Sequence, residues 1–432
     1  MIRFVKIVAF FIISSGYAQY SWTPVGGGMN FAVFAFEKDT VNNILYVGGQ
    51  FDTAGGITTG RIAQWNGTSW DSIGSGLSNG YVSALAMYNA QLYAGGAFTN
   101  SGNKTVKFFS RWNGTSWDSI GFTTGNCNVQ KLTVYNGELY VGGGFPNAGG
   151  ITVNNIARFN GTSWDSVHSG TNNVVNTMAV YNGELYIGGQ FDTSGGIAST
   201  YIAKWNGINW SAVGAGMNNN VYTLAVHNGK LYAGGDFTNA GGNPANYIAM
   251  WDGNNWSALG SGMNSTLQAL HSFNGNLYAG GWFTTAGGNN ANRVARWNGI
   301  TWSALGNGMD DRVRSLGTYN GELYAGGFFT SADGNSAKYI AKWSDATGAQ
   351  SVSGNQVSVT IYPNPSNGKI QVISNQSSVI SIEIYNVLGE KVYSKIINSQ
   401  PSIINLDVPD GMYFVEVETP AGFAVKKIMI RK

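Results

Sequence analysis

Charged side chains are scarce in this chain of 432 residues, where they make up 11% and give a net charge of +2. Basic residues cluster only in the last seven positions, so the sequence lacks the positive patch that nucleic-acid binding requires, and we expect no nucleic-acid partner. The single cysteine, Cys127, excludes an internal disulfide bond. Beyond the N-terminal leader no apolar run approaches the roughly 20 residues of a spanning helix, so we expect no transmembrane span in the mature chain.

The first 18 residues have the pattern of a secretory signal peptide. Arg3 and Lys6 supply positive charge, residues 7–13 are apolar, and Gly16 and Ala18 are small residues that favour cleavage before Gln19. A retained anchor is the alternative. We predict that residues 1–18 are a signal peptide and that the protein is secreted, extracellular or on the outer cell surface.

Glycine and aromatic residues are abundant, with 62 glycines and 13% aromatic side chains. A Leu-Tyr pair followed by Gly-Gly recurs about every 46 residues, at Leu45, Leu92, Leu139, Leu185, Leu231, Leu277 and Leu323. In each repeat a tryptophan or phenylalanine follows some 20 residues later, and in all but the last repeat a second tryptophan comes five residues after it. Repeats of this length are typical of propellers and solenoids.

Each repeat contains four short strand-like runs, which in the fourth repeat are residues 175–180, 184–191, 201–205 and 209–214. Asn182-Gly183 and Asn206-Gly207 lie between consecutive runs, and such dipeptides favour tight hairpin turns with positive φ at both positions. Four-stranded antiparallel units at this period are typical of propeller blades. We therefore predict an all-β fold in which residues 19–343 form a seven-bladed β-propeller with four-stranded blades.

The last repeat lacks the second tryptophan after Trp343, and a segment that matches the missing part of the repeat occurs near the N-terminus. Residues 21–30, which include Trp22, match residues 209–218 and 255–264 of complete repeats. We predict that this N-terminal strand closes the last blade, begun at Val313, and so protects a strand edge. The tryptophans of the two regular positions are expected to pack between blades.

The repeat text LYxGGxF…IAxWNG…W resembles kelch-type propellers. It is still more similar to the propeller repeats of a fungal cortical cell-polarity protein and of many bacterial surface proteins. The spacing from Tyr201 to Trp205 is shorter than the kelch spacing. The resemblance covers residues 20–343 and implies an architecture rather than a function. Copper oxidases with kelch-like rings use a Cys–Tyr pair and histidines, whereas this chain has one cysteine and three scattered histidines, so no cofactor is expected.

The repeats end at Trp343 and are followed by a small, polar segment, residues 344–356, which we interpret as a linker. Residues 357–432 resemble the type A C-terminal sorting domain of the type IX secretion system. The matching segments are YPNPSNG (362–368), IYNVLGEKV (384–392), DGMYFVEV (410–417) and KKIMIRK (426–432). The resemblance implies a small β-sandwich that is recognised by the type IX machinery. An ordinary sandwich module is the alternative.

The longer loops connect the second strand of a repeat to the third, and the fourth strand to the first strand of the next repeat. These loops fall on one face, where we expect any ligand to bind. Trp282 is the one tryptophan outside the regular positions, and its equivalents include Asp236 and Phe328. Near the start of the first strands the matched positions are Ala32, Ser83, Gln130, Asn176, Tyr222, Gln268 and Arg314. The candidate ligand-binding residues are Trp282, Asp236, Phe328, Tyr222, Gln268 and Arg314; the alternative is that they fill gaps in the channel lining.

Three classes of function follow from this pattern. We favour a binding or adhesion module for a glycan or protein ligand, because aromatic faces with convergent polar groups suit sugar rings or a protein loop. A polysaccharide lyase or hydrolase is the alternative, and Asp236, Asp310 and Asp311 are the carboxylates that could form a catalytic pair. A structural surface component without a ligand is the third reading. The three histidines occupy three different repeat positions, so no metal site is expected.

Overall fold

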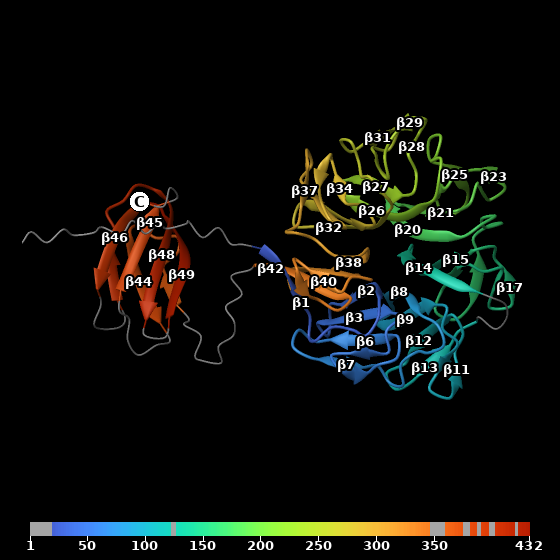
Figure 1. Cartoon of the computed structure of the whole chain (residues 1–432), viewed down its shortest axis with the longest axis horizontal. Coiled ribbons are helices and arrows are strands. Elements are labelled where there is room, and N and C mark those ends of the chain that lie inside the picture. The colour runs from blue at the N-terminus through green and yellow to red at the C-terminus, as the bar shows by residue number, and fades with distance from the viewer. Residues whose placement is uncertain are drawn as a thin grey trace, which may run out of the picture. The chain divides into compact units, whose positions relative to one another are not determined.

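The computed structural model describes residues 20–121, 127–345, 359–374, 381–386, 390–396, 402–419 and 422–432. It divides into two compact units, one of which is Tyr20–Ala346 while the other contains the C-terminal strands (Figure 1). The predicted signal peptide and residues 346–356 of the predicted linker lie outside the described residues. All regular structure in the described part is β, and no helix occurs there that could cross a membrane.

The first unit has a propeller-like fold. Its described residues, between Tyr20 and Asp345, form seven four-stranded antiparallel sheets. In Figure 1 these sheets surround a common centre, with the first strand of each sheet innermost. From the innermost strand outward they are β2 (Val33–Asp39), β3 (Ile44–Gly49), β6 (Ile62–Trp65) and β7 (Trp70–Ser72); β8 (Val82–Tyr88), β9 (Gln91–Gly96), β12 (Phe109–Trp112) and β13 (Trp117–Ser119); β14 (Asn128–Tyr135), β15 (Glu138–Gly144), β18 (Ile156–Phe159) and β19 (Trp164–Ser166); β20 (Val175–Tyr181), β21 (Glu184–Gly189), β24 (Ile202–Trp205) and β25 (Trp210–Ala212); β26 (Val221–His227), β27 (Lys230–Gly235), β30 (Ile248–Trp251) and β31 (Trp256–Ala258); β32 (Leu267–Phe273), β33 (Asn276–Gly281), β36 (Val294–Trp297) and β37 (Trp302–Ala304); and β38 (Val313–Tyr319), β39 (Glu322–Gly327), β42 (Ile340–Asp345) and β1 (Tyr20–Pro24).

The connection between the second and third strand of each sheet carries a short two-stranded ribbon that the sequence pattern did not predict. These ribbons are β4 (Thr53–Ala54) with β5 (Ile57–Thr58), β10 (Asn100–Ser101) with β11 (Lys104–Thr105), β16 (Asn147–Ala148) with β17 (Ile151–Thr152), β22 (Thr193–Ser194) with β23 (Ile197–Ala198), β28 (Asn239–Ala240) with β29 (Asn243–Pro244), β34 (Thr285–Ala286) with β35 (Asn289–Asn290), and β40 (Ser331–Ala332) with β41 (Asn335–Ser336). Single bridges such as Met217↔Ala240 join a ribbon to the preceding crossing. The longer loops are therefore ordered against one another.

The Gly-Gly doublet of each repeat is explained by close packing between strands. A Cβ atom on Gly188 would lie 2.5 Å from Val221 on the first strand of the next sheet. A Cβ atom on the second glycine, Gly189, would collide with the carbonyl oxygen of Val174. Every repeat shows the same two contacts, and Gly326 of the last sheet meets Val33 of the first. The doublet thus lets neighbouring sheets approach closely, and this packing links the last sheet to the first.

The two Asn-Gly dipeptides of a repeat form different turns. Asn182 and Gly183 both have positive φ, 48° and 76°, so this turn is the predicted tight hairpin. The second prediction is wrong, because the turn from Asn206 to Asn209 has four residues between the paired Trp205 and Trp210. The Asn206 side-chain oxygen accepts the backbone N–H groups of Ile208 and Asn209 at 2.9 and 2.8 Å. The side chain of the asparagine, rather than its backbone, therefore closes this turn.

The N-terminal strand β1 pairs with β42 as predicted. Trp22 is opposite Trp343 in the register, and their ring centroids are 5.3 Å apart. The indole N–H of Trp22 donates to the carbonyl of Leu305 in the preceding sheet at 3.2 Å, as Trp210 does to Val167. Strand β42 extends to Asp345, two residues into the segment predicted as linker, because Ser344 and Asp345 pair with β1.

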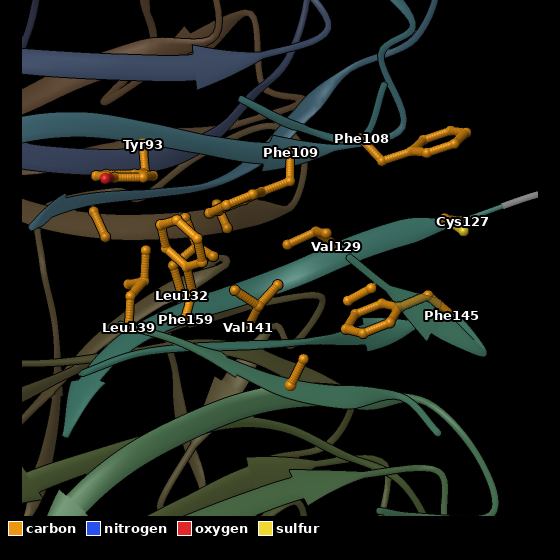
Figure 2. Close-up of a cluster of buried hydrophobic side chains, with 14 of the residues drawn as sticks. Tyr93, Phe108, Phe109, Cys127, Val129, Leu132, Leu139, Val141, Phe145 and Phe159 are labelled. Atoms are coloured by element: carbon orange, nitrogen blue, oxygen red, sulfur yellow. The ribbon is translucent and has the colours of Figure 1, made fainter. Parts of the chain in front are cut away.

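Buried side chains fill the space between adjacent sheets. Figure 2 shows one such cluster, in which Phe109 of β12 and Phe159 of β18 lie among aliphatic side chains. Cys127 belongs to the same cluster, and burial raises the pKa of its thiol. This environment keeps the thiol protonated and accounts for Cys127 as a packing residue.

The C-terminal unit contains two antiparallel sheets. One comprises β43 (Val359–Tyr362), β44 (Lys369–Ser374) and β47 (Ser402–Asn405), and the other comprises β46 (Lys391–Ile396), β45 (Ser381–Asn386), β48 (Gly411–Thr419) and β49 (Gly422–Ile430). Ile370 and Ile404 of the first sheet share one buried cluster with Ile382, Val415 and Ile428 of the second. This cluster is the core that holds the unit together.

Candidate ligand site at the mouth of the central cavity

A β-bulge near the start of each innermost strand places one side chain toward the centre of the first unit. In β26 the pairing with β27 jumps from Val221 to Thr223, so Tyr222 is the extra residue. A bulge re-aims the side chain of its extra residue, which an unbroken strand would point elsewhere. The seven bulge residues are Phe34, Ser83, Gln130, Asn176, Tyr222, Gln268 and Arg314.

The structure corrects one member of this series, because Phe34 and not Ala32 is the equivalent residue of the first repeat. The turn between Asp39 and Ile44 has four residues, two more than the Asn182-Gly183 turn, so the bulge residue lies two positions farther before Leu45 than in the other repeats, at Phe34, and Ala32 is two positions too far. The Asp39 carboxylate closes the longer turn by accepting the backbone N–H groups of Val41 and Asn42. A bulky aromatic side chain therefore stands where the sequence comparison placed a methyl group.

All seven bulge residues line a central cavity of about 290 Å³. Its wall comes from the first strands β2, β8, β14, β20, β26, β32 and β38. Two bulge residues tie neighbouring strands together: Asn176 donates to the carbonyl of Val221 at 3.1 Å, and Ser83 donates to that of Val129. In contrast, the side-chain oxygen of Gln268 is buried and has no hydrogen-bond partner.

Tyr222 and Asp236, predicted as separate candidates, form one hydrogen-bonded pair. The Tyr222 hydroxyl donates to Asp236 Oδ2 at 2.8 Å, and the Thr266 hydroxyl donates to Asp236 Oδ1. Burial raises the pKa of Tyr222, and its bond to Asp236 raises it further. The phenol therefore stays protonated, and the carboxylate is held in place at the edge of the cavity.

Trp282 and Phe328 are joined by a residue that the sequence reasoning missed. The guanidinium carbon of Arg312 lies 4.3 Å from the ring centroid of Trp282 and 3.6 Å from that of Phe328. Stacked arginines of this kind are held by the attraction of the cation to the ring faces. Trp282 stays 40% exposed, so part of its surface is open to solvent. The odd run of charges at 310–314 was the only available signal for Arg312.

Further aromatic side chains extend this cluster around the mouth of the cavity. Phe328 lies 5.6 Å from Phe34 and 6.1 Å from Phe31, measured between ring centroids. Phe34 in turn meets Tyr81 edge to face at 5.7 Å. Aromatic surface thus runs from the sixth sheet across the seventh and first to the second, on the face that carries the longer loops. We call this set, with Trp282, the aromatic arc.

Three titratable side chains lie deeper along the innermost strands. Lys131 lines the cavity, and its side chain is accessible from the cavity space. The surrounding strands nevertheless enclose its amine, and this burial lowers the pKa of the amine. Burial also raises the pKa of Glu37, which accepts the backbone N–H of Met87 at 2.9 Å. Burial, and secondarily the charge of Lys131, lowers the pKa of His271 to about 4. His271 is therefore neutral at physiological pH.

The carboxylates considered for catalysis have structural partners. Asp310 accepts the backbone N–H groups of Thr330 and Ser331 at 2.9 Å each, as Asn218 accepts those of Thr238 and Asn239. Asp311 accepts the backbone N–H of Arg312. Within the described residues no group of three or more His, Cys, Asp or Glu side chains could hold a metal ion.

Comparison with known families identifies two regions of the chain. Residues 360–431 match the secretion system C-terminal sorting domain. Residues 228–249 and 274–298 match the Domain of unknown function (DUF5122) beta-propeller. No curated protein sequence matches this chain.

Three solved structures are similar to this chain at low identity. The WD40 β-propeller domain of Doa1 has 13% identity and a TM-score of 0.49, covering 77% of this chain and 99% of that chain. PorZ, described as an essential bacterial surface component of the type-IX secretion system of Porphyromonas gingivalis, has 14% identity and a TM-score of 0.45, covering 95% of this chain and 61% of that chain. The computationally designed Ika8 protein has 14% identity and a TM-score of 0.41, covering 82% of this chain and 98% of that chain.

The C-terminal match establishes the destination of the protein. A sorting domain of this family marks its carrier for export through the type IX secretion system, to the cell surface or the extracellular space. The predicted localisation is therefore confirmed, and the tail is the part of the chain that engages the secretion machinery.

Proposed function

We propose that this protein is an exported binding module, in which a seven-bladed propeller holds a glycan at the mouth of its central cavity. One observation carries the proposal: the side chains that differ between repeats converge on this mouth, whereas the shared side chains form the framework. Trp282, Phe328 and Arg312 stack there, and the Tyr222–Asp236 pair lies at the cavity edge.

The closed ring is supported by contacts that repeat around the unit. Each first glycine of a doublet opposes an aliphatic residue of the next sheet, and the last of these contacts joins Gly326 to Val33. β1 supplies the outer strand of the last sheet. We likewise infer that the two sheets around the shared C-terminal core form the β-sandwich of the sorting domain. The kelch-like character of the repeats stays a prediction.

A glycan fits this mouth better than a protein loop. Sugar rings stack on aromatic faces, and Trp282 and Phe31 are each 40% exposed along the aromatic arc. The cavity behind the arc, at about 290 Å³, lies just under the roughly 300–1,000 Å³ of common ligand pockets. It therefore admits a single sugar ring or a side group rather than a folded element. Its amide and hydroxyl groups suit a ligand with many hydroxyls.

Binding of the purified protein to a panel of polysaccharides, measured by calorimetry, tests the proposal. Trp282→Ala should weaken saturable binding at least tenfold, or about 1.4 kcal/mol, because it removes aromatic surface at the mouth. Ile208→Ala is the matched control, since Ile208 is 74% exposed in a turn at the opposite end of the strands. Saturable binding that Trp282→Ala leaves unchanged, or that Ile208→Ala weakens equally, would place the ligand elsewhere. Absence of saturable binding across the panel would refute the glycan.

A further inference from the structure

Four arginines of the propeller unit form no ion pair with a described carboxylate: Arg293, exposed Arg296, and the two at the start of β38, Arg312 and Arg314. Arg61, Arg111 and Arg158 each form an ion pair with a carboxylate. Among the residues that the structure describes, neither Arg312 nor Arg314 has a carboxylate within salt-bridge distance. An exposed arginine contributes little less to stability when it has no ion-pair partner, because water solvates its charge. The positions of Arg312 and Arg314 in the fold therefore decide whether their free charges indicate a ligand.

Arg312 contacts two aromatic rings, and these contacts do not use its N–H donors. Its guanidinium carbon lies 4.3 Å from the centroid of Trp282 and 3.6 Å from that of Phe328. Both rings lie within the distance of a cation–π contact, and the five N–H donors lie around the edge of the planar group. Contact with two rings restricts the guanidinium, so less freedom is lost when an oxyanion binds to it.

Arg314 is a bulge residue and lines the cavity. Burial lowers the pKa of its guanidinium, and Arg314 lies only two residues from Arg312 at the start of the same strand. The lining beside it has unmet hydrogen bonds: Gln268 Oε1 and Ser315 Oγ are buried without a partner. A bound anion would compensate the buried charge of Arg314, and hydroxyl groups next to it would satisfy Gln268 and Ser315.

We propose that Arg312 and Arg314 bind the acidic group of an anionic sugar residue, a carboxylate or a sulfate, whose ring enters the mouth of the cavity beside Trp282. This inference rests on the proposed function and names the ligand class within it. A sugar acid is favoured over an acidic peptide because the wall is rich in amides and hydroxyls, among them Gln130, Gln268 and Ser315. These groups match a ring that carries several hydroxyls in addition to its acid.

Pairs of polymers with the same backbone test this inference on the purified protein. We would compare polygalacturonate with its carboxyl-reduced form, and dextran sulfate with dextran, and use polyglutamate as the acidic peptide. At least one acidic polysaccharide should bind ten times more tightly than its neutral partner, and that affinity should fall as salt rises. Which pair shows the difference distinguishes a carboxylate from a sulfate.

Arg314→Gln and Arg312→Gln should each weaken binding of the acidic polymer at least tenfold. Arg314→Lys should recover only part, because an ammonium lacks the planar fork. Arg296→Gln removes an equal charge from an exposed position on β36 and should leave binding unchanged. Melting temperatures of all variants check that the fold is retained.

The outcomes separate this inference from the proposed function. Equal binding of acidic and neutral partners, lost in Trp282→Ala, would refute the anionic sugar and leave the glycan module standing. Acidic binding unaffected by both Gln variants, or reduced equally by Arg296→Gln, would remove the two arginines from the site. Polyglutamate bound as tightly as the acidic polysaccharides would refute the sugar and point to a protein partner. Absence of binding by these polymers, with saturable binding of a neutral polysaccharide of the panel, would refute the anionic sugar alone, and absence of binding in both sets would refute both proposals.

Discussion

Replacement of Trp22 by alanine should destabilise the whole propeller, although Trp22 lies near one end of the chain. Trp22 is 1% exposed, packs 5.3 Å from Trp343 and donates its indole N–H to Leu305 of the preceding sheet. Truncation of a buried tryptophan to alanine costs about 3–5 kcal/mol. Since domains are stable by only about 5–15 kcal/mol, we expect the urea midpoint to fall by a large fraction.

The assay follows tryptophan fluorescence during urea unfolding. All 14 tryptophans precede residue 344, so this signal reports the propeller and is silent on the C-terminal unit. Trp117→Ala is the matched variant, because Trp117 is 0% exposed and donates to Ile73 at the equivalent place in a sheet built from consecutive strands. The two variants should lose similar stability in a single transition. A loss below about 1 kcal/mol for Trp22→Ala alone, or a separate early transition, would show that β1 is only an appended strand.

Two further predictions concern groups with unusual partners. Asp333 accepts the backbone N–H groups of Trp22, Asn307 and Gly308, so Asp333→Ala should lower the free energy of urea unfolding by about 1–3 kcal/mol. Asp333→Asn should lose less, because asparagine keeps an acceptor oxygen and tolerates the φ of 52° at this position. Equal losses in the two variants would contradict this role of the Asp333 side chain. The pKa of His271, about 4, is below its unfolded value of 6.5, so the unfolded state takes up the proton first and stability should fall as pH drops from 6.5 toward 4. Compared with His271→Gln, the native protein should lose up to roughly 3 kcal/mol of stability over this pH range, and less where cavity water screens the charge. The comparison also cancels the contribution of Glu37, whose raised pKa makes stability rise as pH drops. A stability difference between the two proteins that does not change with pH would refute the prediction.

The local sequence patterns predicted the framework because each depends on contacts within a repeat or between neighbouring repeats. The Leu-Tyr and Gly-Gly motif identifies the second strand of each sheet. Only glycine fits at its two last positions, because a side chain of the next sheet packs against the first glycine and a backbone carbonyl oxygen packs against the second. The absent tryptophan after Trp343 predicted its pairing with Trp22. The four-residue Asn206 turn was missed because the same dipeptide closes two kinds of turn.

The candidate site was predicted only in part. Comparison between repeats found Trp282, Phe328, Tyr222 and Asp236 because these residues differ from their equivalents at fixed positions. Arg312 could not be found in this way, because its role depends on two rings contributed by different sheets.

The sequence by itself determined the repeats, the four strands of each sheet, the pairing of the two ends and the export signal in the tail. The reason is that strand periodicity, turn residues and sorting motifs are local, and repetition shows them many times. Tertiary structure alone decided which unmatched side chains meet. The bulges point Phe34 and Arg314 into one cavity, and the approach of two sheets brings Trp282 and Phe328 into contact with Arg312. Such meetings depend on bulges and on distances between sheets, which no run of residues within one repeat encodes.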